Sequence, residues 1–443
     1  MAKRQGRTIF VPDTIIKHHM TTFSTRCRMA FLAMAMTTTA TCVAQANNQT
    51  KENKKWENLI ESESDELMEQ LMNMPYIEVG KGVSFAPKNK LFKMTLRFRM
   101  QNQVTMLFDD DFRLEETQAQ VKRLRLRFDG YLYSPKLLYT IQLGFTPYDT
   151  KTIPNGNTNI VRDAIICYMP SSTWNISFGQ TKVKANRARI NSSSALQFVD
   201  RSIVNSEFNP DRDFGVFGEY HKTWDKNLSL AAKGSVTLGE GRNWGTDKNK
   251  GFAYTTRLEL FPLGRFKGLG EVVEGDFQRE EKVKMMLAGA FTYNDRTNRT
   301  SGQNGSLMPT GHVRDLKQYY MDFILKFRGF AFYTDLMGRV CDRPIVDEEN
   351  GLFVYTGKGV NVQTSYLFKK NWEVALRNST LLPDKEVEQM AGYRRFNQST
   401  LAVTKYLIGH NLKVQADASY NHQARPTDGY NRWQLRFVVE AGL

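Results

Sequence analysis

The sequence predicts an all-β protein, a transmembrane antiparallel β-barrel of about sixteen strands with a short helical or irregular segment before it. Three observations predict this fold. From residue 91 to the end of the 443-residue chain, apolar side chains recur at every second position. The connectors between these alternating segments are short and long in turn, and the N-terminus has the composition of an export signal.

Residues 1–46 have the organisation of a secretory signal peptide. Arg26 and Arg28 precede the apolar run 29–36, which is too short to span a bilayer. The AQA triplet that ends this segment fits a small-residue cleavage site, and Met20 is a second candidate start. The sequence therefore predicts export across the inner membrane and location in a bacterial outer membrane.

Residues 47–90 separate the signal from the alternating region, and we expect them to lie in the periplasm. Apolar residues at roughly helical spacing, with acidic residues between them, run through 53–72. A short amphipathic helix with an irregular lead-in explains this pattern, and so does a partly disordered tail. The pattern leaves both interpretations open.

Strict alternation begins at residue 91 and indicates strands with one wet face and one apolar face. In LFKMTLRFRM the even positions hold Phe, Met, Leu, Phe and Met, and the odd positions between them hold Lys, Thr and two Arg. The same pattern recurs to the last residue. The predicted strands are 91–107, 120–134, 136–147, 160–169, 172–180, 213–222, 226–239, 251–261, 283–294, 318–328, 329–338, 358–368, 371–380, 395–407, 411–422 and 430–443.

The connectors between these strands fall into two classes. Short connectors on one rim and long loops on the other are typical of outer-membrane barrels. The exception is 262–282, which is long where a short turn is expected. The short connectors are 134–136, 170–173, 223–227, 327–330, 368–371 and 407–411, and the long ones are 108–119, 148–159, 181–212, 240–250, 295–317, 339–357, 381–394 and 423–429.

A soluble β-sandwich or β-solenoid also alternates, but it fits this sequence less well. Strands of soluble sheets are usually about 5–6 residues long, whereas many segments here reach the ~9–11 residues of a tilted membrane strand. No fixed repeat period appears, which argues against a solenoid or propeller. Nor does any run approach the ~18 apolar residues of a membrane helix.

Alternating arginines mark one face of the first two predicted strands. In VKRLRLRFDGYLY, Arg123, Arg125 and Arg127 occupy every second position with leucine or phenylalanine after each, and Arg97 and Arg99 occupy the wet face of the strand before. An arginine on the lipid face costs about 2–4 kcal/mol at mid-membrane. We therefore expect all five arginines to face the lumen.

Arg257 is a further inward-facing candidate and completes the predicted set of pore-lining, anion-binding residues. Carboxylates of the same phase, among them Asp129 and Glu440, allow a second interpretation in which paired charges only stabilise the barrel. The excess of five arginines over Asp129 in the first two strands favours anion selectivity, because guanidinium groups bind oxyanions in a bidentate manner and rings of them favour anions.

The connector 181–212 is the longest, and we expect it to fold into the barrel as a constriction. It has apolar positions of its own, and long loops without a function are uncommon. An external loop with surface charge is the alternative. Its predicted constriction residues are Lys182, Lys184, Arg187, Arg189 and Arg201.

The chain resembles the phosphate-selective porin O and P family, in the divergent form common in Bacteroidota. The resemblance rests on RLRFDGYLYSPKLLYTIQLGF, VRDAIICYMPSSTWNISFGQTKV, SSSALQFVDRSIVNSEFNPDRDFGV, TTRLELFPLG and the ending WQLRFVVEAGL. It implies a sixteen-stranded barrel, a homotrimer, an inward third loop and arginines that guide anions. Two departures are the absence of proline after Lys182 and the final Leu443 in place of an aromatic residue.

These observations predict an outer-membrane porin for passive diffusion of small anions, such as phosphate or polyphosphate. A barrel without selective conductance, acting as an adhesin or structural anchor, is the alternative. No GxSxG, HExxH or P-loop motif occurs, so we expect no enzyme and no cofactor. The net charge of +15 favours anionic partners, here inorganic anions and outer-membrane lipid rather than nucleic acid. The acidic run 109–111 is a weak calcium candidate.

Overall fold

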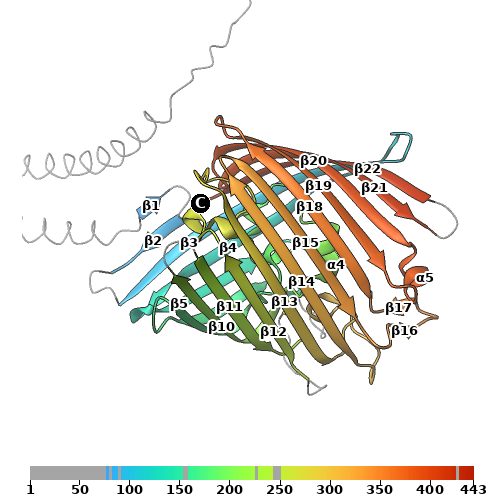
Figure 1. The fold of residues 1–443 in the computed structure, drawn as a ribbon, viewed down its shortest axis with the longest axis horizontal. Coiled ribbons are helices and arrows are strands. Elements are labelled where there is room, and N and C mark those ends of the chain that lie inside the picture. Colours follow the sequence, from blue (N-terminus) through green and yellow to red (C-terminus); the bar gives the residue numbers. More distant parts are fainter. Residues whose placement is uncertain are drawn as a thin grey trace, which may run out of the picture. The chain divides into compact units, whose positions relative to one another are not determined.

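In a computed structural model, the structure describes residues 76–78, 82–87, 91–152, 158–224, 228–242, 251–425 and 429–443. Sixteen strands form a closed antiparallel β-barrel (Figure 1), which confirms the predicted fold class. They are β3 (Phe92–Phe108), β4 (Leu114–Leu132), β5 (Ser134–Gly144), β8 (Val161–Tyr168), β9 (Trp174–Lys182), β10 (Arg212–Trp224), β11 (Leu228–Thr237), β12 (Ala253–Phe261), β13 (Lys284–Thr297), β14 (Arg314–Phe327), β15 (Phe330–Val340), β18 (Gly357–Leu367), β19 (Trp372–Pro383), β20 (Arg395–Ile408), β21 (Leu412–Ala424) and β22 (Gly429–Gly442).

The barrel closes where its last strand, β22, pairs with its first, β3. The pairing runs from Trp433 opposite Phe108 to Gly442 opposite Arg99. Because closure pairs the first and last strands, the backbone donors and acceptors of both have partners, as the hydrocarbon core of a membrane requires.

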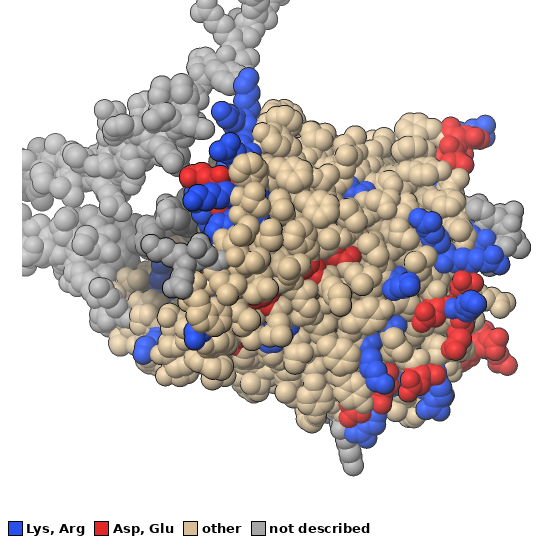
Figure 2. All heavy atoms as spheres, viewed as in Figure 1, with Lys and Arg blue, Asp and Glu red and all other residues tan. Residues whose placement is uncertain are grey.

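Strand β12 shows why the sequence folds with this polarity. Its residues are alternately buried and exposed along the whole strand. Leu258 on the outer face is 60% exposed, whereas Arg257 on the inner face is 1% exposed. In Figure 2 the charged side chains of the visible face gather mainly near its two ends, and most of the band between them is uncharged. Charge is therefore placed inside or at the rims, as the lipid penalty requires.

Two predicted long loops are shorter than expected because the strands beside them extend further. Strand β3 runs to Phe108 and β4 begins at Leu114, within the predicted connector 108–119. Residues 114–121 are exposed, so these positions need no apolar face and the alternation that predicts strands is lost there. Strands β21 and β22 likewise leave only 425–428 as their connector.

A short hairpin precedes the barrel in the segment expected to be irregular. It consists of β1 (Tyr76–Glu78) and β2 (Gly82–Phe85), and β2 pairs with β3 from Val83 opposite Leu96 to Phe85 opposite Met94. The hairpin continues the β3 edge just beyond the end of β22. The predicted signal 1–46 and the predicted helix 53–72 lie outside the described residues.

The connector from β9 to β10, residues 183–211, lies against inward-facing side chains of distant strands, and we call it the inner loop. Lys413 of β21 donates to the carbonyls of Ser194 and Leu196, both at 3.0 Å. The Tyr320 hydroxyl of β14 donates to the Phe208 carbonyl at 3.0 Å. The loop contains α3 (Arg187–Ile190), η1 (Ser193–Ala195) and α4 (Ile203–Phe208).

The hydrophobic core lies inside the barrel, between the inner loop and one side of the wall. Val204 and Phe208 of α4 are fully buried and belong to one cluster with Tyr320, Ile324 and Met337 of β14 and β15. The remaining short elements lie in connectors: η2 (Lys267–Val272), η3 (Gly302–Asn304), α5 (Glu388–Ala391), and the hairpins β6 (Lys151–Thr152) with β7 (Thr158–Asn159) and β16 (Ile345–Asp347) with β17 (Leu352–Phe353). Among the described residues no helix is long and apolar enough to cross a membrane.

Candidate functional site

Five guanidinium groups lie in register on the inner face of β3 and β4. Arg97 is directly opposite Arg127, and Arg99 is directly opposite Arg125, while Arg123 is opposite a glutamine one step further along. Like charges directly opposite each other on neighbouring strands are destabilising. The arrangement therefore needs counter-charges.

Asp129 is one such counter-charge, and Glu440 of β22 is another. The Asp129 carboxylate binds Arg97 at 3.0 Å and Arg127 at 2.8 Å. Glu440 accepts two hydrogen bonds from the Arg99 guanidinium, at 2.7 and 2.9 Å. Carboxylates from elsewhere in the chain therefore also pair with these arginines, which reduces the positive charge that the first two strands present to the lumen.

Asp149, in the connector after β5, neutralises two further arginines. Its carboxylate binds Arg125 at 2.8 Å and Arg162 of β8 at 2.9 Å, and the side chain is fully buried. Burial by itself raises the pKa of Asp149, but Arg125 and Arg162 outweigh burial and lower this pKa below its ordinary value. Asp149 therefore stays ionised and holds both arginines in place.

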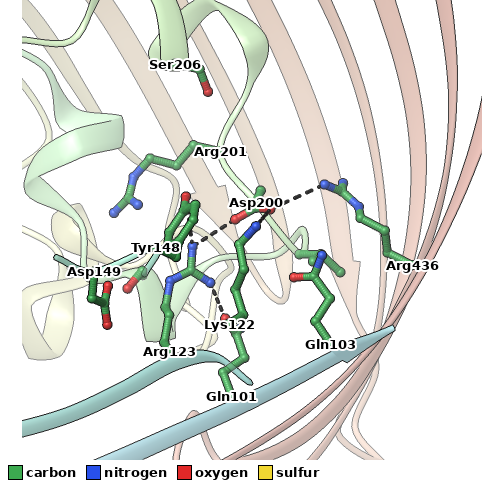
Figure 3. A network of polar contacts seen from close by, with 12 residues as sticks. Gln101, Gln103, Lys122, Arg123, Tyr148, Asp149, Asp200, Arg201, Ser206 and Arg436 are labelled. Atoms are coloured by element: carbon green, nitrogen blue, oxygen red, sulfur yellow. Dashed lines mark hydrogen bonds and ion pairs between the residues drawn. The ribbon is translucent and has the colours of Figure 1, made fainter. Parts of the chain in front are cut away.

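Asp200 of the inner loop connects β4, the second strand of the barrel, to β22, the last strand (Figure 3). One carboxylate oxygen accepts from Arg123 Nη2 at 2.8 Å, and the other lies 3.5 Å from both Lys122 Nζ and Arg436 Nη1. Burial raises the pKa of Asp200, but Arg123, with Lys122 and Arg436, outweighs it and holds this pKa well below its ordinary value. In Figure 3 the next residue, Arg201, extends away from this carboxylate.

A cavity of about 1150 Å³ lies between these strands and the inner loop. All five predicted arginines of β3 and β4 line it. Thirteen cationic side chains line the cavity, against three carboxylates, those of Asp163, Asp200 and Asp211. The cations are Arg97, Arg99, Arg123, Arg125, Arg127, Arg162, Lys182, Lys184, Arg189, Arg201, Arg212, Arg242 and Arg436. Ten of the thirteen cations pair with a carboxylate, and five of these carboxylates, Asp129, Asp149, Glu219, Asp417 and Glu440, lie outside the lining itself. The cavity therefore keeps an excess of positive charge, but a smaller one than its lining alone suggests.

Four of the five predicted constriction residues reach this cavity. Lys184 pairs with Glu219 of β10, and Arg189 pairs with Asp211 at the end of the inner loop. Lys182 and Arg201 both donate to main-chain carbonyls of the inner loop itself; Arg201, for example, binds the Ala188 carbonyl at 2.6 Å.

Arg187 and Arg257, also predicted as site residues, do not line the cavity and instead fix the inner loop. The Arg187 guanidinium donates to the carbonyls of Glu271 and Val273, both at 2.6 Å. Arg257 binds Asp322 at 2.6 and 2.9 Å and also donates to the Ala185 carbonyl. Alternation places the Arg257 side chain on the inner face of the barrel, but it does not show whether that part of the wall lines the pore or is covered by a loop.

The cavity also contains arginines that were not predicted as site residues. Arg162 stands where strict alternation would turn it toward lipid, yet both Arg162 and Asp163 are buried. A register shift between Gln142 and Leu143 in the pairing of β5 with β8 leaves Arg162 as the extra residue of a bulge, and bulges re-aim side chains. Arg242 lies in a connector, which has no phase. Arg436 has the inward phase that alternation predicts on the last strand, although it is not in the predicted set of anion-binding residues.

Three of the thirteen cations make no ion pair with a carboxylate in the part of the chain that the structure describes: Lys182, Arg201 and Arg242. Burial, followed by repulsion from Arg123, lowers the pKa of Arg201 to about 10. Burial, followed by repulsion from Arg212, also lowers the pKa of Arg242 to about 10. Both guanidiniums keep their charge at neutral pH, and neither forms a salt bridge with a carboxylate of the described residues.

Other parts of the described chain offer no comparable site. Within the described ranges, no three His, Cys, Asp or Glu side chains gather to hold a metal ion. The acidic run 109–111 makes contacts within the protein: Asp109 accepts from the Arg113 amide at 2.8 Å, and Asp110 accepts from Asn431 at 2.8 Å.

Comparison with known proteins places the fold and the family. The family described as phosphate-selective porin O and P matches residues 92–438. The chain is similar to the outer membrane channel DcaP of Acinetobacter baumannii, with 11% identity and a TM-score of 0.50 over 82% of this chain and 100% of that chain. It is also similar to OmpF of Salmonella typhi in complex with daunomycin, with 11% identity and a TM-score of 0.49 over 84% of this chain and 100% of that chain. The likeness to OmpT of Vibrio cholerae in a trimer form has 12% identity and a TM-score of 0.47 over 78% of this chain and 99% of that chain. At such identities the likeness to DcaP is one of fold. No curated protein matches the chain.

Proposed function

Because this chain belongs to the phosphate-selective porin O and P family, we propose that it forms a passive outer-membrane channel that favours small anions, phosphate or polyphosphate among them. The family and the fold indicate a channel rather than an enzyme.

The thirteen cations and three carboxylates around one cavity are the observation that carries this proposal. A narrow cleft lined by one sign of charge, with low-dielectric walls, concentrates ions of the opposite sign. Arginine rings favour anions, and guanidinium forks match the oxygens of phosphate. Conduction also needs several sites that each bind the ion weakly enough to release it. Arginines that are paired with a carboxylate bind an anion more weakly than free arginines do, and therefore suit conduction better.

Within this passage we assign different roles to the predicted site residues. Arg97, Arg99, Arg123, Arg125 and Arg127 form the wall, and Lys182, Lys184, Arg189 and Arg201 form the constriction. Arg187 and Arg257 act through the inner loop, which they hold in position. We also propose that the protein assembles as a homotrimer, and that residues 1–46 direct its export and are then removed.

Planar-bilayer recording of the purified protein tests the proposed function. We expect steady channels whose reversal potential in a KCl gradient has the sign of anion selectivity. Addition of phosphate at low chloride should reduce the chloride current if phosphate binds in the passage. A protein that inserts but carries no current would be a non-conducting barrel, and cation selectivity would overturn the charge argument.

The double variant Arg201→Ala with Arg242→Ala tests which residues select. It removes two charges that form no salt bridge with a carboxylate among the described residues, so anion selectivity should fall. Arg113→Ala is the matched control, since its side chain is 78% exposed in the turn between β3 and β4 and does not line the cavity. Equal selectivity of the double variant and the control would place the passage elsewhere.

A further inference from the structure

The connector between β12 and β13 enters the lumen from the rim that carries the short turns. It comprises residues 262–283, and we call it the rim insertion; the other connectors on that rim are one to five residues long. The alternation of short and long connectors predicts a short turn at this position. Its length therefore calls for a physical explanation, because a turn between adjacent antiparallel strands needs few residues.

Cations of the wall and of the inner loop hold the rim insertion by its main-chain carbonyls. Lys326 Nζ, on β14, donates to the carbonyls of Gly270, Val273 and Gly275 at 2.7, 2.8 and 2.7 Å. These three bonds use every proton of the ammonium group. Arg187 of the inner loop donates to two carbonyls of the same segment.

The rim insertion and the inner loop also bind each other directly, from opposite rims. The main-chain N–H of Gln197 donates to the Glu274 carboxylate at 2.9 Å, and the main-chain N–H of Glu274 donates to the Ala195 carbonyl at 3.4 Å. A Cβ atom on Gly275 would lie 2.5 Å from the Glu373 carboxylate of β19, so a larger residue would displace that carboxylate. The two segments together occupy the lumen beside β14 and β19 and leave the basic cavity beside β3 and β4.

One residue of the rim insertion is unfavourable for both its conformation and its surroundings. Leu269 has φ 57° and ψ 37°, the left-handed region that leucine rarely adopts, and its side chain is 64% exposed. It lines the basic cavity together with Val272 and Val273. Neither packing nor backbone preference accounts for a leucine here, and strained positions of this kind cluster at functional sites.

We propose that the rim insertion gives the passage an apolar side opposite its guanidinium side, so that it favours organic anions with a hydrocarbon part over inorganic anions. The inference rests on the proposed function and specifies its substrate class. The carboxylate of such a solute would bind the arginine forks, and its ring or chain would cover Leu269, Val272 and Val273. A fully hydrated phosphate gains nothing from that apolar side.

Block of chloride current by benzoate and by acetate provides the test, because the two solutes share a carboxylate and differ in the ring. In the unmodified protein we expect half-block by benzoate at about tenfold lower concentration than by acetate or phosphate. Leu269→Asn should remove most of this difference and leave the acetate block unchanged. Asparagine tolerates the left-handed conformation, so the backbone of the rim insertion is kept.

Leu263→Asn is the matched control, since Leu263 lies in the same insertion, is 41% exposed and does not line the cavity. Benzoate and acetate should block the current of this variant as they block that of the unmodified protein. Equal block by benzoate and acetate in the unmodified protein, or an equal effect of both leucine variants, overturns this inference and leaves anion conduction standing. Absence of any anion current overturns the proposed function and the inference together.

Discussion

Arg123 of β4 and Asp200 of the inner loop form an ion pair, with 2.8 Å between Nη2 and Oδ1 and with the arginine side chain 1% exposed. The pair fixes the inner loop to the barrel wall. It also removes part of the positive charge that the wall would otherwise present. Because the pKa of Asp200 is held well below its ordinary value, the carboxylate is ionised at neutral and mildly acid pH. The anion preference that we propose would therefore depend on a balance between the arginines of the wall and the carboxylates of the loops.

Asp200→Asn should make the channel more anion-selective and the barrel less stable. The amide keeps the shape but removes the counter-charge of Arg123, Lys122 and Arg436. Loss of one partner of a buried pair costs about 3 kcal/mol. Reversal potentials and thermal unfolding measure the two effects. Asp111→Asn, whose side chain is 73% exposed, is the control and should change neither.

Arg257→Gln should destabilise the barrel without changing ion selectivity. The variant removes the ion-pair partner of Asp322 and one of the two partners of Glu259. Because the side chains of Asp322 and Glu259 are both nearly fully buried, the loss should cost about 3–5 kcal/mol. Arg97→Gln is the reverse case, because its side chain is 44% exposed and lines the cavity. It should shift selectivity and cost less than about 1 kcal/mol. A selectivity shift in the Arg257 variant would contradict its anchoring role.

The attachment of the rim insertion should weaken as the pH falls below about 6.5. The His410 ring, in the turn after β20, lies 4.2 Å from the ring of Phe277 in the rim insertion and 5.3 Å from that of Tyr406. Burial, followed by repulsion from Lys413, lowers the pKa of His410 well below its ordinary value. When the segment unfolds, His410 regains its ordinary pKa, so below that pKa the unfolded state binds more protons than the folded state. The stability of the attachment therefore declines as the pH drops through that range.

Protection factors of residues 262–283 in hydrogen exchange, which correct for the pH dependence of the intrinsic exchange rate, measure this effect at about pH 7.5 and about pH 5 and should fall at the lower pH. His410→Phe keeps the ring contacts and removes the titrating group, so its protection factors should not depend on pH in this range. His312→Phe, at an exposed histidine in a long connector, should retain the dependence. Identical protection factors at both pH values in the unmodified protein would exclude His410 as the sensor.

Gly275→Val should detach the rim insertion from its partners. The added side chain would meet the Glu373 carboxylate within 2.5 Å, and overpacking of this kind costs about 1–3 kcal/mol. We expect larger single-channel conductance, because the displaced segment opens the lumen. Gly289→Val, on the outer face of β13 with open space around it, is the control. Unchanged conductance in the Gly275 variant would mean that the insertion does not limit the passage.

Much of the wall could be predicted from the sequence because its rule is local. The inward phase of Arg97, Arg99, Arg123, Arg125 and Arg127 follows from a period of two and the cost of charge in lipid. The rule failed at Arg162, where a bulge re-aims one side chain, and it has no meaning for Arg242 in a connector. Nor did it separate Arg257 from the wall arginines, because phase does not say which part of the lumen a loop will fill.

The sequence by itself determined the barrel, its strand phase and its family, since alternation, connector length and motif are properties of neighbouring residues. Only the tertiary structure decided which cations keep an uncancelled charge. Asp200 lies 77 positions from Arg123, and Glu440 lies 341 positions from Arg99. Such pairs arise when closure of the barrel joins its first and last strands and the inner loop folds back onto them. Periodicity describes a single strand, whereas charge balance depends on every segment that meets in the lumen.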